Sequence, residues 1–186
     1  MGSRGKKKLI RNLVDGEKIL ITIAPTAGFT VGFNLTFSGS VYIDFKDGDG
    51  KEALTSGVEK THLYAIAGTY IAEISGDLEN ITKFIADNNR ITSISNLKTG
   101  LLEDLRVNNN LITGTLNLVN APVQKRFECQ ENSGLTGITF ASFGNQKLTY
   151  IRVFNCNLTG ALNLSTVPIG DPSSSSLYAY NIAPSV

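Results

Sequence analysis

The sequence of 186 residues is poor in the residue types that most enzyme sites use. It contains one histidine, His62, and two cysteines, Cys129 and Cys156. A Ser-His-Asp or Cys-His arrangement would have to use His62, and no G-x-S-x-G motif is present. These three residues are also too few for a structural zinc site built from cysteine and histidine. We therefore expect no catalytic residue and no cofactor.

Signals for phosphate groups, membranes and nucleic acids are missing as well. The chain has neither a G-x-G-x-x-G sequence nor a P-loop, and no run of 18 apolar residues that would predict a membrane span. Its acidic residues show no visible catalytic pair. The formal net charge is +1, so bulk electrostatics predict binding to neither nucleic acids nor a membrane surface.

Basic residues are concentrated only at the start of the chain. Residues 1–18 are polar, and the excess of positive charge there comes from Arg4, Lys6, Lys7, Lys8 and Arg11. The segment predicts a solvated basic arm, with a partner-binding arm as the alternative. No apolar h-region follows it, so we expect a protein that is not exported or one whose signal peptide was removed.

Short runs rich in β-branched and aromatic residues follow and predict an antiparallel β-domain over residues 19–76. The main runs are KILITIA, FTVGFNLTF, SVYIDF and GTYIAEIS, separated by turn residues and, between the last two, by a looser loop through Gly57. Three carboxylates, Asp44, Asp47 and Asp49, lie on one short loop and could hold calcium. The favoured interpretation is a turn in which these aspartates bond backbone amides, so no metal site is expected.

Two segments of this β-domain resemble the polycystic-kidney-disease (PKD) domain, an immunoglobulin-like β-sandwich. YIDFKDGDG, from Tyr42, is similar to the W-D-F-G-D-G motif of that family. HLYAIAGTYIAEI, from His62, is similar to its H-x-Y…G-x-Y strand pair. Tyrosine replaces the tryptophan of the motif, and Lys46 replaces its first glycine. The resemblance implies a turn stabilised by aspartates, with the histidine and tyrosine packed beside it.

A repeated pattern occupies residues 77–164. The stretch from Ile81 fits L-x-x-L-x-L-x-x-N-x-L, and the pattern recurs from Leu102 and from Leu148, with a degraded copy between them. The polar slot is filled at steps of 21, 22 and 24 residues by Asn89, Asn110, Asn132 and Cys156. This pattern resembles the leucine-rich repeat, in which cysteine substitutes for asparagine, and it predicts a solenoid of about four coils. Four unrelated strands of a sandwich are the alternative.

The repeat pattern assigns a place to each side chain. Apolar residues on either side of an outward residue make a short strand, and the polar slots should stack into a ladder that bonds backbone groups freed by the turn. The outward residues form three columns: Lys83, Asp104, Arg126 and Tyr150; Ile85, Arg106, Glu128 and Arg152; Asp87, Asn108, Gln130 and Phe154. Arginine with tyrosine and phenylalanine favours a binding face, and an ordinary solvated surface is the alternative.

The two cysteines should remain free thiols. Cys129 occupies an inward slot, and Cys156 lies three residues further along the next coil. Strand spacing and rise place them about 10 Å apart, which is too far for a disulfide. We expect both to be buried as small hydrophobes.

The two ends of the solenoid differ. The β-domain should cap its N-terminal end, whereas residues 165–186 form a Pro/Ser-rich segment in which only Leu177, Ala179 and Ile182 suggest a partial strand. This poorly capped end and the basic arm predict that the two termini make most contacts with neighbouring chains and that the face of outward columns is a secondary site.

The sequence as a whole predicts a mainly β protein, a short PKD-like β-sandwich continuous with a short leucine-rich-repeat solenoid, that is not an enzyme. Modules of both kinds resemble parts of bacterial surface proteins and of bacteriophage structural proteins. The first hypothesis is a bacteriophage virion accessory protein (capsid decoration, head fibre or tail) bound to other protein chains as an oligomer or part of a complex. The alternative is a bacterial cell-surface adhesin or ligand-binding module.

Overall fold

The structure is a computed structural model that describes residues 17–121, 123, 125–140, 148–159 and 176–178. Strands make up nearly all of its regular structure, which confirms the mainly β character predicted from the sequence. The expected basic arm up to residue 16, the end of the repeat region from residue 160, and the C-terminal segment apart from residues 176–178 lie outside the described residues.

The described strands divide at a short 3-10 helix, η1 (Leu78–Asn80), which follows the N-terminal β-domain. Before it come β1 (Ile19–Ile23), β2 (Phe29–Phe37), β3 (Val41–Asp44), β4 (Lys51–Ala53), β5 (Glu59–Tyr64) and β6 (Tyr70–Gly76). After it come β7 (Ile81–Ile85), β8 (Ile91–Ser95), β9 (Asp104–Arg106), β10 (Thr113–Leu118), β11 (Arg126–Glu128), β12 (Gly134–Phe140), β13 (Tyr150–Arg152) and β14 (Ser176–Tyr178).

Alternating apolar residues explain the strands of the N-terminal half. In β1, Ile19, Ile21 and Ile23 are buried while the residues between them are partly exposed, as expected for strands with one face on a core. β6 pairs antiparallel with β1 on one side and with β3 on the other, and β2 pairs antiparallel with β5.

Two strands were not predicted at their full extent. β4 and the first part of β5 occupy the segment that the sequence favoured as a loop through Gly57. Both lie at the edge of their sheet, where one side of the strand faces solvent, so their residues are mostly polar and lack a clear apolar alternation. Periodicity is therefore a weak signal for strands in these positions.

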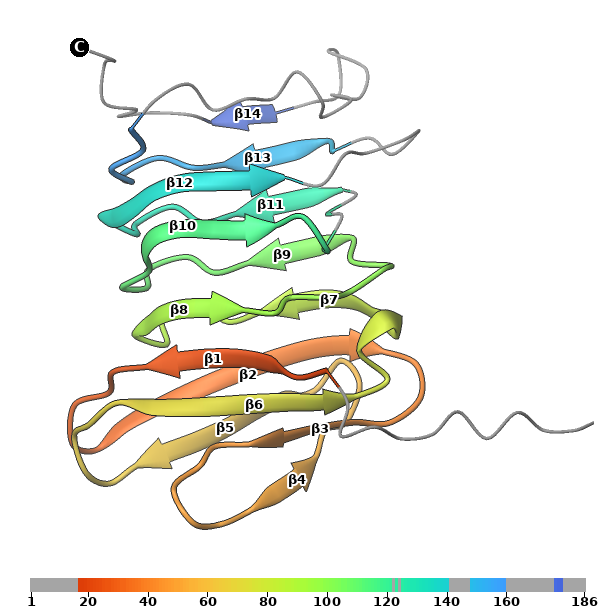
Figure 1. Cartoon of the computed structure of the whole chain (residues 1–186), viewed down its shortest axis with the longest axis vertical. Helices are drawn as coiled ribbons and strands as arrows, with labels where there is room; N and C mark the ends of the chain where they lie inside the picture. Colours follow the sequence, from red (N-terminus) through yellow and green to blue (C-terminus); the bar gives the residue numbers. More distant parts are fainter. Residues whose placement is uncertain (1–16, 122, 124, 141–147, 160–175, 179–186) are drawn as a thin grey trace, which may run out of the picture.

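The two large sheets both extend from the N-terminal into the C-terminal half (Figure 1). One has the order β4-β3-β6-β1-β8, and the other has the order β14-β13-β11-β9-β7-β2-β5. The junctions are antiparallel, β8 with β1 and β7 with β2. Strand pairing in both large sheets therefore joins the segments before and after residue 76, where the sequence suggested a domain boundary.

The C-terminal half is a stack of short parallel strands. β7, β9, β11, β13 and β14 pair in parallel, one above the next, while β10 and β12 pair in parallel in a separate sheet. The strand registers align the inward side chains of Phe84, Leu105, Phe127 and Ile151, all of them buried. The apolar core is continuous with that of the N-terminal half.

Candidate binding face

A buried asparagine, Asn110, holds neighbouring levels of the parallel stack together. Its Oδ1 accepts hydrogen bonds from the backbone N–H groups of Asn89 and Ile91, each at 3.0 Å. Its Nδ2 donates to the carbonyl oxygens of Ala86 at 2.8 Å and Val107 at 3.0 Å. The amide therefore satisfies backbone groups of two successive levels, which lose their water when the turn is buried.

Asn132 and Asn89 repeat this arrangement above and below. Asn132 Nδ2 donates to the carbonyl of Val107 at 2.9 Å, and its Oδ1 accepts from Ile112 N at 3.0 Å. Asn89 bonds instead to Gly32 of β2, accepting from its N–H at 2.8 Å and donating to its carbonyl at 2.5 Å. The row of buried amides thus ends on a strand of the N-terminal half.

Cys156 occupies the next position of this row. Its Sγ donates to the carbonyl of Cys129 at 3.3 Å, the contact that corresponds to the bond from Asn132 Nδ2 to Val107 O. Both cysteines are free and buried, which confirms that prediction. Their side chains nevertheless interact: burial raises the pKa of Cys129, and the hydrogen bond with Cys129 lowers the pKa of Cys156. The backbone separation expected from the sequence did not predict this contact between the two thiols, because the Cys156 side chain turns back towards the level below.

The strand registers place the outward residues of successive strands opposite one another. The first row across β7, β9, β11 and β13 is Lys83, Asp104, Arg126 and Tyr150, and the second is Ile85, Arg106, Glu128 and Arg152. Backbone hydrogen bonds beyond the strand ends, such as Asn88 N to Asn108 O at 3.0 Å, extend the same alignment. The third row lies just beyond these strand ends and consists of Asp87, Asn108, Gln130 and Phe154. We call these three rows the strand face.

Several residues of the strand face are covered by their neighbours rather than open to solvent. Glu128 is only 3% exposed and Asn108 only 6%. The Glu128 carboxylate is paired with Arg126, accepts a hydrogen bond from Asn108 Nδ2 at 3.1 Å, and lies 3.9 Å from Arg152 Nη1. The sequence pattern identified the direction of Glu128 but not this burial, which arises because long arginine side chains lie across it.

The arginines of the strand face are held by partners on both sides. Arg126 lies 4.6 Å from the ring centroid of Tyr150, and Arg152 lies 5.4 Å from the same ring and 6.0 Å from that of Phe154. Arg106 forms two bonds with Asp104, at 3.0 and 2.6 Å, and they raise the pKa of its guanidinium. Carboxylates and aromatic rings therefore fix the guanidinium planes in advance of any partner.

Asp87 lies at the opposite end of the third row from Phe154. Its Oδ1 accepts a hydrogen bond from Asn108 N at 2.8 Å. Burial is the main cause that raises the pKa of Asp87, and the nearby Glu128 charge acts in the same direction. The third row thus runs from a carboxylate, Asp87, to an aromatic ring, Phe154.

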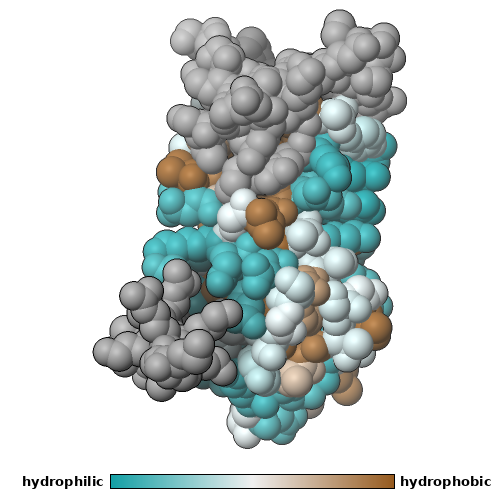
Figure 2. All heavy atoms as spheres, turned by 90° about the vertical axis from the view of Figure 1, so that its right-hand side faces the viewer, coloured by the Kyte–Doolittle hydropathy of each residue, from teal (hydrophilic) through white to brown (hydrophobic). Residues whose placement is uncertain are grey.

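A groove of about 320 Å³ opens beside the first row. Lys83, Asp104 and Arg126 line it together with Thr36, Thr82, Glu103 and Lys125. Lys125 forms an ion pair with Glu103 at 2.7 Å. Hydrophilic atoms predominate on the side of the molecule shown in Figure 2, and hydrophobic atoms form separate patches on its described surface. The groove is lined mostly by charged side chains, so a partner there would be recognised through charge and hydrogen bonding.

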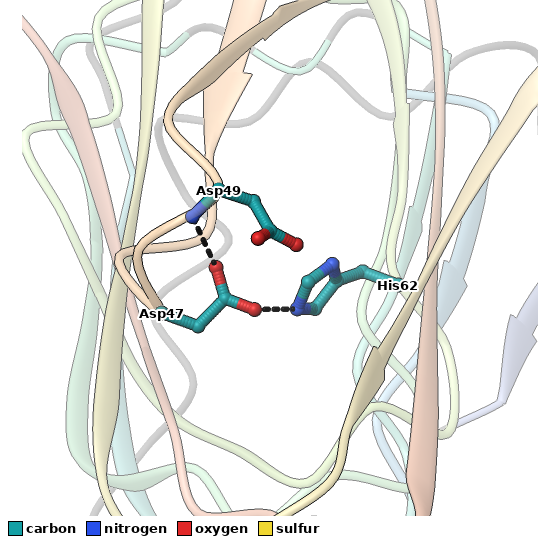
Figure 3. A group of neighbouring side chains, drawn as sticks. All are labelled: Asp47, Asp49 and His62. Atoms are coloured by element: carbon teal, nitrogen blue, oxygen red, sulfur yellow. Dashed lines mark hydrogen bonds and ion pairs between the residues drawn. The ribbon is translucent and has the colours of Figure 1, made fainter.

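The aspartate loop after β3 makes the backbone hydrogen bonds that the favoured interpretation predicted, and its possible ligand atoms differ from the three carboxylates of the alternative calcium site. Asp44 Oδ2 pairs with Lys46 Nζ at 2.7 Å, and its Oδ1 accepts from Lys46 N at 2.9 Å. Asp47 Oδ1 accepts from Asp49 N at 3.3 Å, while Asp47 Oδ2 lies 2.7 Å from His62 Nε2 (Figure 3). The possible ligand atoms that come within 4.8 Å of one another belong to Asp47, Asp49 and His62. Asp44 is outside this group, because Lys46 draws its carboxylate away.

His62 is packed into the end of the N-terminal core. Its ring stacks on Phe45 with centroids 4.1 Å apart and planes 10° apart, and it meets the edge of Tyr64 at 4.7 Å. Tyr64 in turn donates to the carbonyl of Phe45 at 3.3 Å, and burial strongly raises the pKa of its hydroxyl. The resemblance of these segments implied a histidine beside the aspartate turn, and His62 Nε2 lies 2.7 Å from Asp47 Oδ2. Asp47 and Asp49 lie on the connection between β3 and β4, and His62 lies on β5.

Comparison with protein-family models, curated proteins and solved structures gives no match to this chain. Within the described residues, no helix has the length and apolar character that crossing a bilayer requires.

Proposed function

We propose that the protein is a non-catalytic protein-interaction module, a leucine-rich-repeat solenoid that begins on a PKD-like β-sandwich and binds its partner through the strand face. The observation that carries this proposal is the alignment of the three outward rows by parallel strand pairing. Side chains in such rows are held at fixed spacing by a rigid frame, which suits recognition of a matching surface.

The centre of the proposed interface is the cluster of Arg126, Tyr150, Arg152 and Phe154. Arginine and large aromatic residues supply most of the binding energy in protein interfaces. Arg126 and Arg152 are already oriented by Glu128 and by the aromatic rings, so binding would immobilise few additional rotamers. A protein surface bearing carboxylates or backbone carbonyls would complement these guanidinium groups.

The setting that we propose is a bacteriophage virion, with this chain as an accessory protein of the capsid, head fibre or tail. The support for it is the resemblance of YIDFKDGDG and of the repeated segments to modules of such structural proteins. In that setting the strand face would bind another protein chain of the particle. The alternative setting is the bacterial cell surface, and the experiment below distinguishes it from the virion.

The experiment compares two pairs of substitutions in the phage or bacterial source. Tyr150→Ala with Arg152→Ala removes the centre of the strand face and leaves Arg126 beside Glu128. Tyr42→Ala with Lys51→Ala is the control, because this pair makes a similar cation–π contact at 4.1 Å between β3 and β4, away from the strand face. Each tagged variant is quantified by mass spectrometry in purified particles, after thermal melting has confirmed that it folds.

We expect the unchanged chain and the control variant to be present in particles at equal levels, and the strand-face variant to be depleted at least about tenfold, the loss expected from removing one central anchor. Equal incorporation of both variants would show that the strand face is not the interface. Recovery of the unchanged chain from intact cells, and not from particles, would replace the virion setting with the cell surface.

A further inference from the structure

The loop after β3 and the edge strand β5 bring together a set of possible metal-ligand atoms that the proposed function does not use. Asp47 and Asp49 come from the connection between β3 and β4, whereas His62 comes from β5. Their ligand atoms all lie within 4.8 Å of one another, and Figure 3 shows both carboxylates turned towards the imidazole. Around one ion with ligands about 2.0–2.2 Å away, Asp47 Oδ2 and His62 Nε2 would move slightly apart from their present 2.7 Å, and the more distant ligand atoms would move closer together.

His62 adds an independent observation to this cluster. Its side chain is only 9% exposed, and its Nε2 is directed at the carboxylates. Although Asp47 Oδ2 lies 2.7 Å away, Nε2 has no hydrogen-bond partner of suitable geometry among the described residues. The stacking on Phe45 and the edge contact with Tyr64 hold the ring in this direction. A buried nitrogen fixed in this way is pre-oriented as a ligand.

The charges around the cluster leave its carboxylates available to a cation. Lys46, the basic residue of the same loop, is engaged by Asp44 at 2.7 Å and by Glu73 at 3.1 Å. Within the described part of the chain, Asp47 and Asp49 form no ion pair with lysine or arginine. The described residues therefore place no lysine or arginine against the two carboxylates of the cluster.

We propose that Asp47, Asp49 and His62 form a site for a divalent ion of the zinc class, independent of the interaction that the strand face provides. One imidazole nitrogen and two carboxylates are ligands that Zn²⁺ and similar ions accept, with water in the remaining position. Calcium prefers six to eight oxygen ligands and gains nothing from the imidazole. The ion would link the β3–β4 connection to β5 and so stiffen the end of the N-terminal strands.

The test measures binding of Zn²⁺ alone and of Ca²⁺ alone to the untagged chain by isothermal titration calorimetry, with thermal melting as a second readout. Asp49→Asn is the main variant, since Asp49 is an exposed residue outside the apolar core and its loss should not impair folding. Asp44→Asn is the matched control, a carboxylate of the same loop that pairs with Lys46 outside the cluster. His62→Gln removes the nitrogen ligand.

We expect one Zn²⁺ per chain, a higher melting temperature with Zn²⁺ than with Ca²⁺, and an affinity that falls at least about tenfold in Asp49→Asn and in His62→Gln. Asp44→Asn should bind as the unchanged chain does. Absence of Zn²⁺ binding, binding that persists in Asp49→Asn, or tighter binding of Ca²⁺ would each overturn the proposal. If His62→Gln does not fold, Asp49→Asn against Asp44→Asn still decides the question.

Discussion

Single buried amides stabilise the parallel stack by replacing the water that its turns lose. Each of Asn89, Asn110 and Asn132 both donates and accepts towards the backbone of an adjacent level. An alkyl side chain of similar size could fill the space but could not serve these groups, and an unsatisfied buried N–H or carbonyl is costly. This explains why the positions are polar although they lie in the core.

Replacing Asn110 with alanine tests this explanation. The variant leaves the N–H groups of Asn89 and Ile91 without an acceptor, so we expect unfolding to require about 1–3 kcal/mol less free energy. Asn117→Ala is the control, since Asn117 makes one exposed bond, to Val119 N. Urea denaturation measures both. Equal midpoints for the two variants would contradict the role assigned to Asn110.

Two carboxylates should give stability an opposite dependence on pH. Burial raises the pKa of Asp87, so its contribution to stability is present below its ordinary value of 3.8 and is lost as pH rises through the folded-state pKa. Lys18 and then Lys46 lower the pKa of Glu73, so its contribution is present above 4.5 and is lost as pH falls through the folded-state pKa.

At neutral pH, Asp87→Asn should therefore melt at a higher temperature than the unchanged chain, and Glu73→Gln at a lower one. The difference for Asp87→Asn should shrink as pH falls below the raised folded-state pKa of Asp87, and the difference for Glu73→Gln should shrink as pH falls through the lowered folded-state pKa of Glu73. Melting curves measured from pH 3 to 7 check this. Parallel curves for all three proteins would show that neither carboxylate has the environment described.

The repeat spacing in the sequence predicted which positions these polar residues occupy, but it predicted less well which side chains surround them. Asn89, Asn110 and Asn132 stood out because a stacked chain returns to the same position at a near-constant step. The PKD-like segments implied a histidine beside the aspartate turn. The burial of Glu128, in contrast, depends on which side chains of neighbouring strands cover it. No local pattern encodes that information.

Individual elements were predictable where one face of a strand is buried. β1, β2, β3 and β6 alternate clearly and lie close to their expected ranges, whereas the sequences of the edge strands β4 and β5 are mostly polar and show no alternation of apolar residues. The connection from β6 to η1 adds a conformational requirement. Gly76 has φ +113°, and a Cβ atom there would lie 2.1 Å from the carbonyl oxygen of Ser40.

Gly76→Ala should therefore disturb the pairing of β3 with β6. The backbone of Ser40 cannot move aside without breaking its bond to Asp77 N at 2.9 Å, so we expect a loss of about 1–3 kcal/mol or more. Gly57→Ala is the matched control, because Gly57 has φ +77° but open space around it, and it should lose only about 1 kcal/mol. Chemical denaturation should rank them in this order, and a smaller effect at Gly76 would refute the steric argument.

At the scale of the whole molecule, the two halves share their sheets rather than meeting at an interface. β1 pairs with both β6 and β8, and β2 pairs with both β5 and β7. Asn89 adds side-chain bonds to Gly32 across the same junction. Separating the halves would expose two long strand edges and open a continuous apolar core.

We therefore expect the chain to unfold in one cooperative transition. Differential scanning calorimetry should give a calorimetric enthalpy equal to the van't Hoff enthalpy, and fluorescence of tyrosines in the N-terminal half should change together with the circular dichroism of the whole chain. Asn89→Ala weakens the junction itself, so it should lower the melting temperature without splitting the transition. Two resolved transitions in the unchanged chain would show that the N-terminal strands fold as an independent unit. In that case the strand pairing across residue 76 would contribute little to stability, and the rows of the strand face would be held by the parallel stack alone.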